Sequence, residues 1–296
     1  MRKESSRNWI RVTRREPCPV CERSDYCSRS ADGNVVCCMR VESAKPSGGS
    51  LGGWIHRLTD PLPARKPRPK QSTERIDWTE TALRMFTARQ AKAEREWLSE
   101  KLTLRIDALE EMLIGWGWDE YRNRPFSAWP ERDAEGKVVG IVRRYRDGAK
   151  KTMEHSHHGL YYGRTPTVMP GPIFLPEGGS DTAALIGVGV NVIGRPSNTG
   201  GVDDLAAMLA KATKVIVVLG ERDEKLDRKG TNCPADCAGC MWCFPGLAGA
   251  KQTVKRLAEK LNRAVALRMF PGAKDAREWL KQNPGATAPD ILQVLA

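Results

Sequence analysis

Two stretches decide the fold of this chain: IFLPEGGSD (173–181) and VIVVLGERD (215–223). Each begins as a short apolar run and ends in acids, and the second run is typical of a strand buried on both faces of a parallel sheet. Ligands of such sheets gather outside the carboxyl ends of the strands. We therefore expect Glu177, Glu221 and Asp223 to lie close together at one edge of the sheet.

Carboxylates that meet in this way need cations. Oxygen ligands with room for water and phosphate suit Mg²⁺ or Mn²⁺, the ions that neutralise phosphates during phosphoryl transfer. The alternative is that each acid caps a helix or lies in a solvated turn. That alternative suits any single acid, but it explains the whole set poorly.

The order and spacing of four segments resemble the Toprim domain shared by bacterial and phage primases, topoisomerases and some nucleases. These segments are EGGSD (177–181), VIGRPSNTGG (192–201), Glu221-x-Asp223 and Lys274-Asp275. The first acid of the pair is usually Asp in that family; here it is Glu221, a longer carboxylate that still ligates metal.

The resemblance implies an α/β fold with a Toprim (Rossmann-like) parallel sheet. It also implies that catalytic Mg²⁺ or Mn²⁺ is held by Glu177 and Asp223, with Glu221 and with Asp181 or Asp275. Two further residues of the matching segments, Arg195 and Lys274, are expected to bind nucleotide or nucleic acid.

Length and charge bound the possibilities. The chain has 296 residues, enough for two domains or for one domain with a small module. Its 48 Lys and Arg against 36 Asp and Glu give a net charge of +12, which favours a polyanionic partner without identifying nucleic acid. No apolar stretch reaches membrane-spanning length and the start lacks a secretory signal, so we expect a cytoplasmic protein without a membrane partner.

Nine cysteines fall in two tight clusters, which favours metal binding over disulfides. In the first cluster, a hairpin at residues 32–36 is expected to return the last ligand. The first cluster offers five cysteines, and tetrahedral zinc needs four ligands. Because adjacent strand residues point to opposite faces, Cys37 and Cys38 are not both expected to bind. The ending Cys38-Met39-Arg40 resembles the Cys-x-Arg ending of zinc modules in phage and plasmid primases. The expected ligands are Cys18, Cys21, Cys27 and Cys38.

The second cluster comprises Cys233, Cys237, Cys240 and Cys243. Four thiolates in one loop can close around a structural zinc ion. An iron–sulfur cluster is the alternative. Either way, this insertion is atypical of Toprim domains.

The remaining segments complete a primase-like layout. Residues 78–111 are helical in pattern and residues 126–146 alternate as antiparallel strands, which resembles the amino-terminal lobe of the polymerase domain in bacterial-type primases. Three histidines at 155, 157 and 158 are expected in a surface loop. Five basic residues are expected to contact phosphates of template or nucleotide: Arg143, Arg144, Arg146, Lys150 and Lys151. The alternative for each of them is a solvated strand residue without a ligand.

These observations predict four regions: a zinc ribbon (1–44), a flexible linker (45–73), a basic α+β lobe (74–168) and a Toprim domain (169–296) with a four-cysteine insertion at 230–246. The predicted activity is that of a DNA primase, which synthesises RNA primers from ribonucleotides on single-stranded DNA and works with a separate replicative helicase. A Toprim nuclease and a catalytically silent nucleic-acid-binding subunit are the alternatives.

Overall fold

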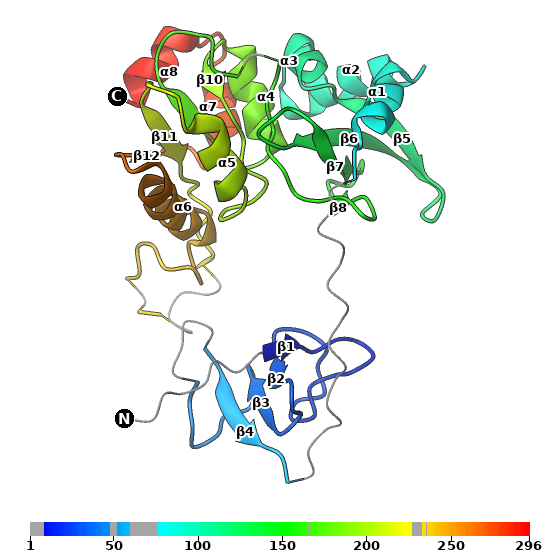
Figure 1. Ribbon diagram of the computed structural model, residues 1–296, viewed down its shortest axis with the longest axis vertical. Helices are drawn as coiled ribbons and strands as arrows, with labels where there is room; N and C mark the ends of the chain where they lie inside the picture. The colour runs from blue at the N-terminus through cyan, green and yellow to red at the C-terminus, as the bar shows by residue number, and fades with distance from the viewer. Residues whose placement is uncertain (1–8, 48–51, 60–75, 165, 227–232, 235) are drawn as a thin grey trace. The chain divides into compact units, whose positions relative to one another are not determined.

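The computed structural model describes most of the chain, namely residues 9–47, 52–59, 76–164, 166–226, 233–234 and 236–296. The chain divides into two units, Met1–Thr73 and Glu74–Ala296, each with its own sheets (Figure 1). Within the described ranges, no helix is both long and apolar enough to cross a membrane.

The amino-terminal unit contains an antiparallel sheet in the order β1-β2-β3-β4. Its strands are β1 (Trp9–Arg11), β2 (Ser28–Ser30), β3 (Val35–Cys38) and β4 (Trp54–Arg57). The buried core is small and consists of Val12, Val36 and three cysteines. So small a core supplies little burial energy, and such modules depend on metal or other crosslinks.

The predicted hairpin at residues 32–36 is present, because β2 and β3 pair in antiparallel fashion. The predicted linker, however, begins too early at residue 45. Strand β4 pairs with β3 along its whole length, with Trp54 opposite Cys38. The Gly- and Ser-rich sequence before Trp54 concealed this short strand. Residues 60–73 of the predicted linker lie outside the described residues.

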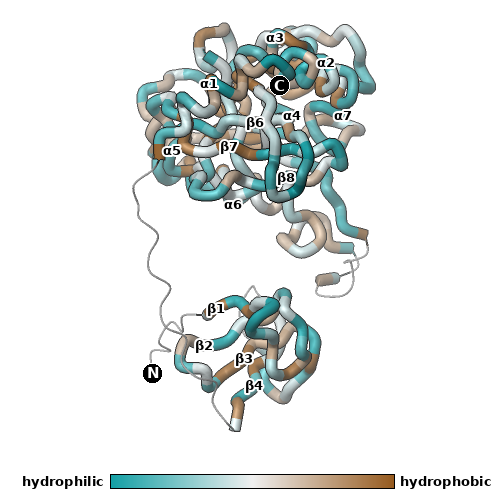
Figure 2. The backbone as a smooth tube through the Cα atoms, turned by 90° about the vertical axis from the view of Figure 1, so that its right-hand side faces the viewer, coloured by the Kyte–Doolittle hydropathy of each residue, from teal (hydrophilic) through white to brown (hydrophobic). Residues whose placement is uncertain are grey.

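The first half of the second unit is the predicted α+β lobe. Three helices, α1 (Thr79–Thr87), α2 (Ala91–Leu102) and α3 (Ile106–Glu111), precede an antiparallel sheet in the order β5-β6-β7-β8. Its strands are β5 (Gly115–Asp119), β6 (Arg124–Arg132), β7 (Val138–Arg144) and β8 (Lys150–Thr152). The backbone coloured by hydropathy is hydrophobic along part of β7 and mainly hydrophilic along α7 (Ala276–Gln282) (Figure 2).

The second half contains the predicted parallel sheet, in the order β10-β9-β11-β12. Its strands are β9 (Ile173–Leu175), β10 (Asn191–Val192), β11 (Ile216–Leu219) and β12 (Ala266–Arg268). The two runs that decide the fold are neighbours here, since β9 pairs with β11. The predicted α/β fold class is confirmed.

Helices cover both faces of the parallel sheet, as its continuous apolar strands require. Ile216 and Val218 of β11 pack in one cluster with residues of α5 (Val202–Leu209) and α6 (Pro245–Leu261). Val217 and Leu219 pack in the other cluster with residues of the remaining three helices. These are α4 (Gly179–Gly187), α7 and α8 (Ala288–Val294).

A third core cluster joins the two halves of this unit. It contains Leu98 and Leu109 from the first helices, Trp129 and Val142 from the antiparallel sheet, and Ala183 from α4. Close-packed interiors transmit position with little play. The antiparallel sheet is therefore held at a fixed position relative to the amino-terminal end of α4.

Candidate active site and metal centres

Three carboxylates meet where the parallel strands end. Glu221 follows β11, Asp181 lies in the first turn of α4, and Asp275 is the N-cap of α7. One carboxylate oxygen from each lies within 4.8 Å of the others. The N–H of Arg277 donates to Asp181 Oδ1 at 3.0 Å, and the N–H of Glu278 donates to Asp275 Oδ1 at 2.8 Å. These helix-end contacts fix one oxygen of each aspartate; the second oxygen has only a longer contact, from Ser180 Oγ at 3.5 Å for Asp181 and from Lys274 Nζ at 3.9 Å for Asp275.

Nearby cations offset the negative charge of this cluster only in part, since the pKa values of two of its acids stay raised. Burial raises the pKa of Asp181 to about 7, and the neighbouring Asp275 carboxylate adds to the shift. Burial also raises the pKa of Glu221 to about 8, with Glu177 as the next cause. Lys274 is the nearby cation, at 4.0 Å from Glu221 and 3.9 Å from Asp275. Acids held this way take up protons unless a divalent cation binds among them.

Glu177 and Asp223 are beside this cluster rather than in it. Burial raises the pKa of Glu177, and the Asp223 carboxylate contributes to the shift against the opposing charge of Arg195. Glu177 Oε2 is buried and has no hydrogen-bond partner within the described part of the chain. An orphaned buried acceptor of this kind fits a bound cation. Both oxygens of Asp223, by contrast, accept from the N–H of Gly246 at 3.0 Å.

Arg195 does not have the predicted nucleotide-binding position. Its side chain is completely buried, and its guanidinium donates to the carbonyls of Leu175 (3.2 Å), Asn198 (2.7 Å) and Leu219 (2.9 Å). Leu175 and Leu219 are the last residues of β9 and β11. Arg195 therefore links the two strand ends that precede Glu177 and Glu221, and its charge interacts with both acids. Sequence alone cannot separate this internal role from a phosphate contact.

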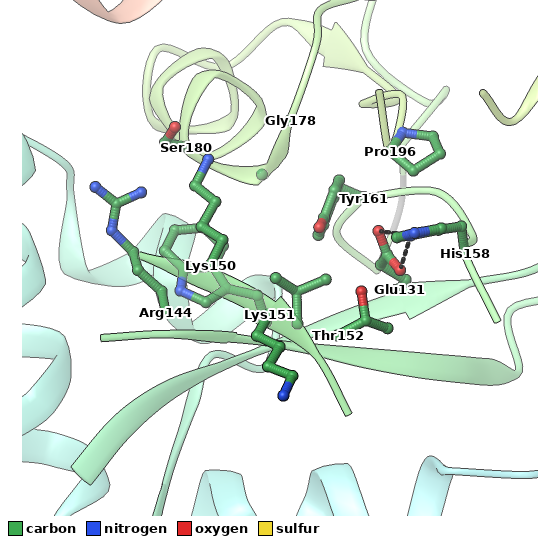
Figure 3. A pocket seen from close by; sticks show the side chains of 13 residues that line it. Glu131, Arg144, Lys150, Lys151, Thr152, His158, Tyr161, Gly178, Ser180 and Pro196 are labelled. Carbon is green, nitrogen blue, oxygen red and sulfur yellow. Dashed lines mark hydrogen bonds and ion pairs between the residues drawn. The ribbon is translucent and has the colours of Figure 1, made fainter. Parts of the chain in front are cut away.

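A pocket of about 170 Å³ lies between the antiparallel sheet and the start of α4 (Figure 3). Its basic lining residues are Arg144, Lys150 and Lys151, and Gly178–Ser180 forms part of its wall. Burial lowers the pKa of Lys150, and the charge of Arg144 adds to this effect. Asp181 and Glu221 oppose the shift, so Lys150 is close enough to sense the acid cluster. The pocket thus places cations next to the candidate metal site.

Arg143 and Arg146 are engaged away from this pocket. Arg143 is 15% exposed and pairs with Asp119 at 2.9 Å. Arg146 pairs with the buried Glu94 at 2.8 Å and lies 3.9 Å over the ring of Trp97. Strand alternation separates Arg143 from its neighbour Arg144, since successive side chains point to opposite faces. The charge of Arg143 is used in an ion pair inside the protein, and its predicted phosphate contact stays a prediction.

An ion pair in the pocket was missed by sequence reasoning. Glu131 on β6 is completely buried, and His158 Nδ1 lies 3.1 Å from its Oε2 (Figure 3). The hydrogen bond to Glu131 raises the pKa of His158. Burial and the same carboxylate raise the pKa of Tyr161, which also lines the pocket. His158 lies in the predicted loop, and its ring faces Glu131 in the pocket (Figure 3). The available signal was a glutamate directly after the apolar residues of β6.

Four cysteines of the amino-terminal unit form the first thiol cluster: Cys18, Cys21, Cys27 and Cys38. The Cys21–Cys27 and Cys27–Cys38 sulfur distances are 3.6 and 3.9 Å. A disulfide needs about 2.05 Å, whereas tetrahedral zinc with bonds of about 2.3 Å separates its sulfurs by roughly 3.8 Å. Cys37 is outside the group, and its thiol lies 3.6 Å from the carbonyl of Gly52. The donor set fits zinc.

The second thiol cluster lies between β11 and α6. Its members are Cys233, Cys237, Cys240 and Cys243, whose sulfurs are within 4.8 Å of one another. The Cys233–Cys243 and Cys240–Cys243 distances are 3.5 and 3.4 Å. This set also fits a four-coordinate zinc site.

A scan of protein-family models and a search of curated proteins found no match for this chain. Among solved structures, the E. coli primase catalytic core is similar over 72% of this chain and 75% of its own, with 16% identity and a TM-score of 0.49. The primase fragment of the bacteriophage T7 primase-helicase protein covers 98% of this chain and 100% of its own, with 17% identity and a TM-score of 0.43.

The Aquifex aeolicus primase, comprising zinc-binding and RNA polymerase domains, is similar over 95% of this chain and 77% of its own. Its identity is 14% and its TM-score is 0.47. The structural neighbours of this chain are thus bacterial and phage primase catalytic cores, at low sequence identity, and they are of the kind that the sequence motifs resemble.

Proposed function

We propose that this chain is a metal-dependent nucleotidyltransferase that synthesises short RNA primers on single-stranded DNA. The observation that carries the proposal is the meeting of Asp181, Glu221 and Asp275 at the ends of parallel strands, next to a pocket lined by cationic side chains. Acids alone would suit many metal sites. Acids beside Lys150 and Arg144 suit a polyphosphate substrate that is charged along its length.

The acid cluster would hold Mg²⁺ or Mn²⁺, with Glu177 and Asp223 completing the set. Bound there, the metal would supply charge neutralisation at the α-phosphate and at the attacking and departing oxygens. Glu177 favours this role because its buried Oε2 lacks a donor among the described residues. Asp223 keeps a fixed orientation through its two contacts with Gly246. Lys274 lies at the rim of the cluster and would approach the phosphates rather than the ion.

Lys150 and Arg144 would bind the nucleotide or template phosphates. Arg144 is half-buried and Lys150 is exposed at the pocket, so both side chains can contact an anion that enters it. His158 would add a third donor, because Glu131 on its Nδ1 side favours the charged imidazolium. Lys151 also lines the pocket, but it lies opposite Arg143 on the neighbouring strand and its side chain points away from that of Lys150 (Figure 3), so its phosphate contact stays a prediction.

The two four-cysteine clusters would each hold a structural zinc ion. The amino-terminal ribbon would contact template, since a tethered second module lowers the entropic cost of assembling two nucleotides on DNA. A separate replicative helicase is the expected partner.

Incubation of the full chain with single-stranded DNA, ribonucleotides and Mg²⁺ or Mn²⁺ tests the proposal. New RNA whose length depends on all four ribonucleotides supports it. Degraded DNA would instead identify a nuclease, and DNA binding without any product would identify a silent accessory subunit. A Glu177→Gln variant, which keeps the side-chain volume and removes the charge, is the matched control for metal-dependent chemistry.

A further inference from the structure

We propose that the second thiol cluster positions two acids of the active site, Asp223 and Glu221, through the first turn of α6. The proposal rests on the proposed function in taking these acids as ligands of the catalytic metal. It assigns a role to an insertion that the reaction itself does not require.

The first turn of α6 is built against the acids. The N–H of Gly246 donates to both oxygens of Asp223, each at 3.0 Å. Gly246 is the second residue of a 17-residue helix, whose amino-terminal end carries partial positive charge and favours a carboxylate. A Cβ atom on Gly246 would lie 2.9 Å from Asp223 Oδ1 and 3.0 Å from Glu221 Cβ. The backbone therefore approaches both acids as closely as glycine permits.

The cysteines fix the chain on both sides of this contact. The N–H of Lys225, two residues after Asp223, donates to the carbonyl of Cys243 at 2.7 Å. The N–H of Phe244, which precedes α6, donates to the carbonyl of Cys240 at 2.9 Å. Cys243 is completely buried. The thiol cluster thus holds the segment that leaves the acids and the segment that enters the helix.

A hydrogen bond from Asn198 holds the same turn from another side. The side-chain Nδ2 of Asn198 donates to the carbonyl of Pro245 at 3.1 Å, and the backbone carbonyl of Asn198 accepts from Arg195 at 2.7 Å. The first turn of α6 is therefore fixed between the Asn198 loop and the thiol cluster. Loss of the metal would weaken one of these two supports, and the Gly246 N–H would no longer be held firmly against Asp223.

The first test compares one cysteine substitution in each cluster of the full chain. Zinc is counted by elemental analysis, and Mn²⁺ affinity is measured without nucleotide by titration calorimetry. Cys240→Ser should lose one zinc and bind Mn²⁺ about 10-fold more weakly, since a charge-assisted contact to a ligand is lost. Cys21→Ser should lose one zinc and bind Mn²⁺ like the unaltered protein. A Cys240→Ser protein that keeps both zinc ions, or that loses one with unchanged Mn²⁺ affinity, overturns the proposal.

A second variant leaves all the cysteines in place and decides the matter if Cys240→Ser is insoluble. Gly246→Ala should retain two zinc ions, because it changes no cysteine. It should nevertheless bind Mn²⁺ about 10-fold more weakly, because the new Cβ displaces Asp223 and Glu221. Wild-type Mn²⁺ affinity in Gly246→Ala contradicts the proposal. A wild-type chain that binds Mn²⁺ but makes no RNA would refute the proposed function and leave this inference standing.

Discussion

The acid cluster predicts a steep dependence of metal affinity on pH. In the metal-free protein, Asp181 has a pKa of about 7 and Glu221 a pKa of about 8. A metal that binds both carboxylates must displace their protons. Below about pH 7 two protons leave, so affinity should rise about 100-fold per pH unit; between about pH 7 and pH 8 it should rise about 10-fold, and above that range it should level off.

Stability should show the opposite trend in the absence of metal. Both acids have a folded-state pKa above the ordinary value of about 4, so the folded protein holds more protons than the unfolded chain between about pH 4 and pH 8. The free energy of unfolding of the metal-free protein should therefore decrease as pH rises through this window. Added Mn²⁺ should restore the most stability at the alkaline end.

Titration calorimetry in two buffers with different ionisation enthalpies counts the protons directly. The zinc-loaded full chain should release about two protons per Mn²⁺ near pH 6 and almost none near pH 9. Glu221→Gln should release about one proton or fewer, because it removes one titrating group and relieves the repulsion on Asp181. Mn²⁺ affinity that is constant between about pH 6 and pH 8, or proton release unchanged in Glu221→Gln, would refute the reasoning.

Three further predictions concern the proposed activity and metal content. Glu177→Gln should reduce nucleotide transfer by at least about 100-fold while DNA binding and Tm stay close to those of the unaltered chain, and normal turnover would show that Glu177 is not a metal ligand. Elemental analysis should find two zinc ions per chain, so a single zinc or visible absorbance from iron would contradict the assignment of the second cluster. Lys150→Ala should weaken nucleotide binding about 10-fold, whereas Arg143→Ala should lower the Tm by a few degrees and leave nucleotide affinity unchanged; equal losses of affinity would contradict the structural separation of these two side chains.

The apolar runs were sufficient to predict the parallel sheet. A continuous β-branched run such as 215–219 is stable only when both faces are covered, and the helices on either side of β11 provide that cover. The meeting of acids at the strand ends follows from the same rule, because the carboxyl ends of parallel strands share one edge. The family resemblance indicated Asp181 or Asp275 as a metal ligand, but only the structure shows that both lie close to Glu221, because that closeness depends on how α4 and α7 pack.

Other features depend on three-dimensional contacts that leave weak signals in the sequence. Arg195 is buried because two strand carbonyls and a loop carbonyl converge on its guanidinium, and no local pattern reports this. Strand β4 is a four-residue edge strand that follows a Gly- and Ser-rich segment. It is defined by its pairing with β3, in which Trp54 lies opposite Cys38, and no local sequence pattern reports this pairing. Strand alternation could have separated Arg143 from Arg144, because adjacent side chains on β7 face opposite sides.

The most direct test of the central claim is the synthesis of RNA from free ribonucleotides on single-stranded DNA, measured side by side for the full chain and for Glu221→Gln at the same Mn²⁺ concentration. Glu221→Gln is chosen because this residue joins Asp181 and Asp275 in the acid cluster. The account predicts new RNA from the unaltered chain and a rate at least about 100-fold lower from the variant. Equal RNA synthesis by both proteins, or no RNA from the unaltered chain at any Mg²⁺ or Mn²⁺ concentration, would contradict it.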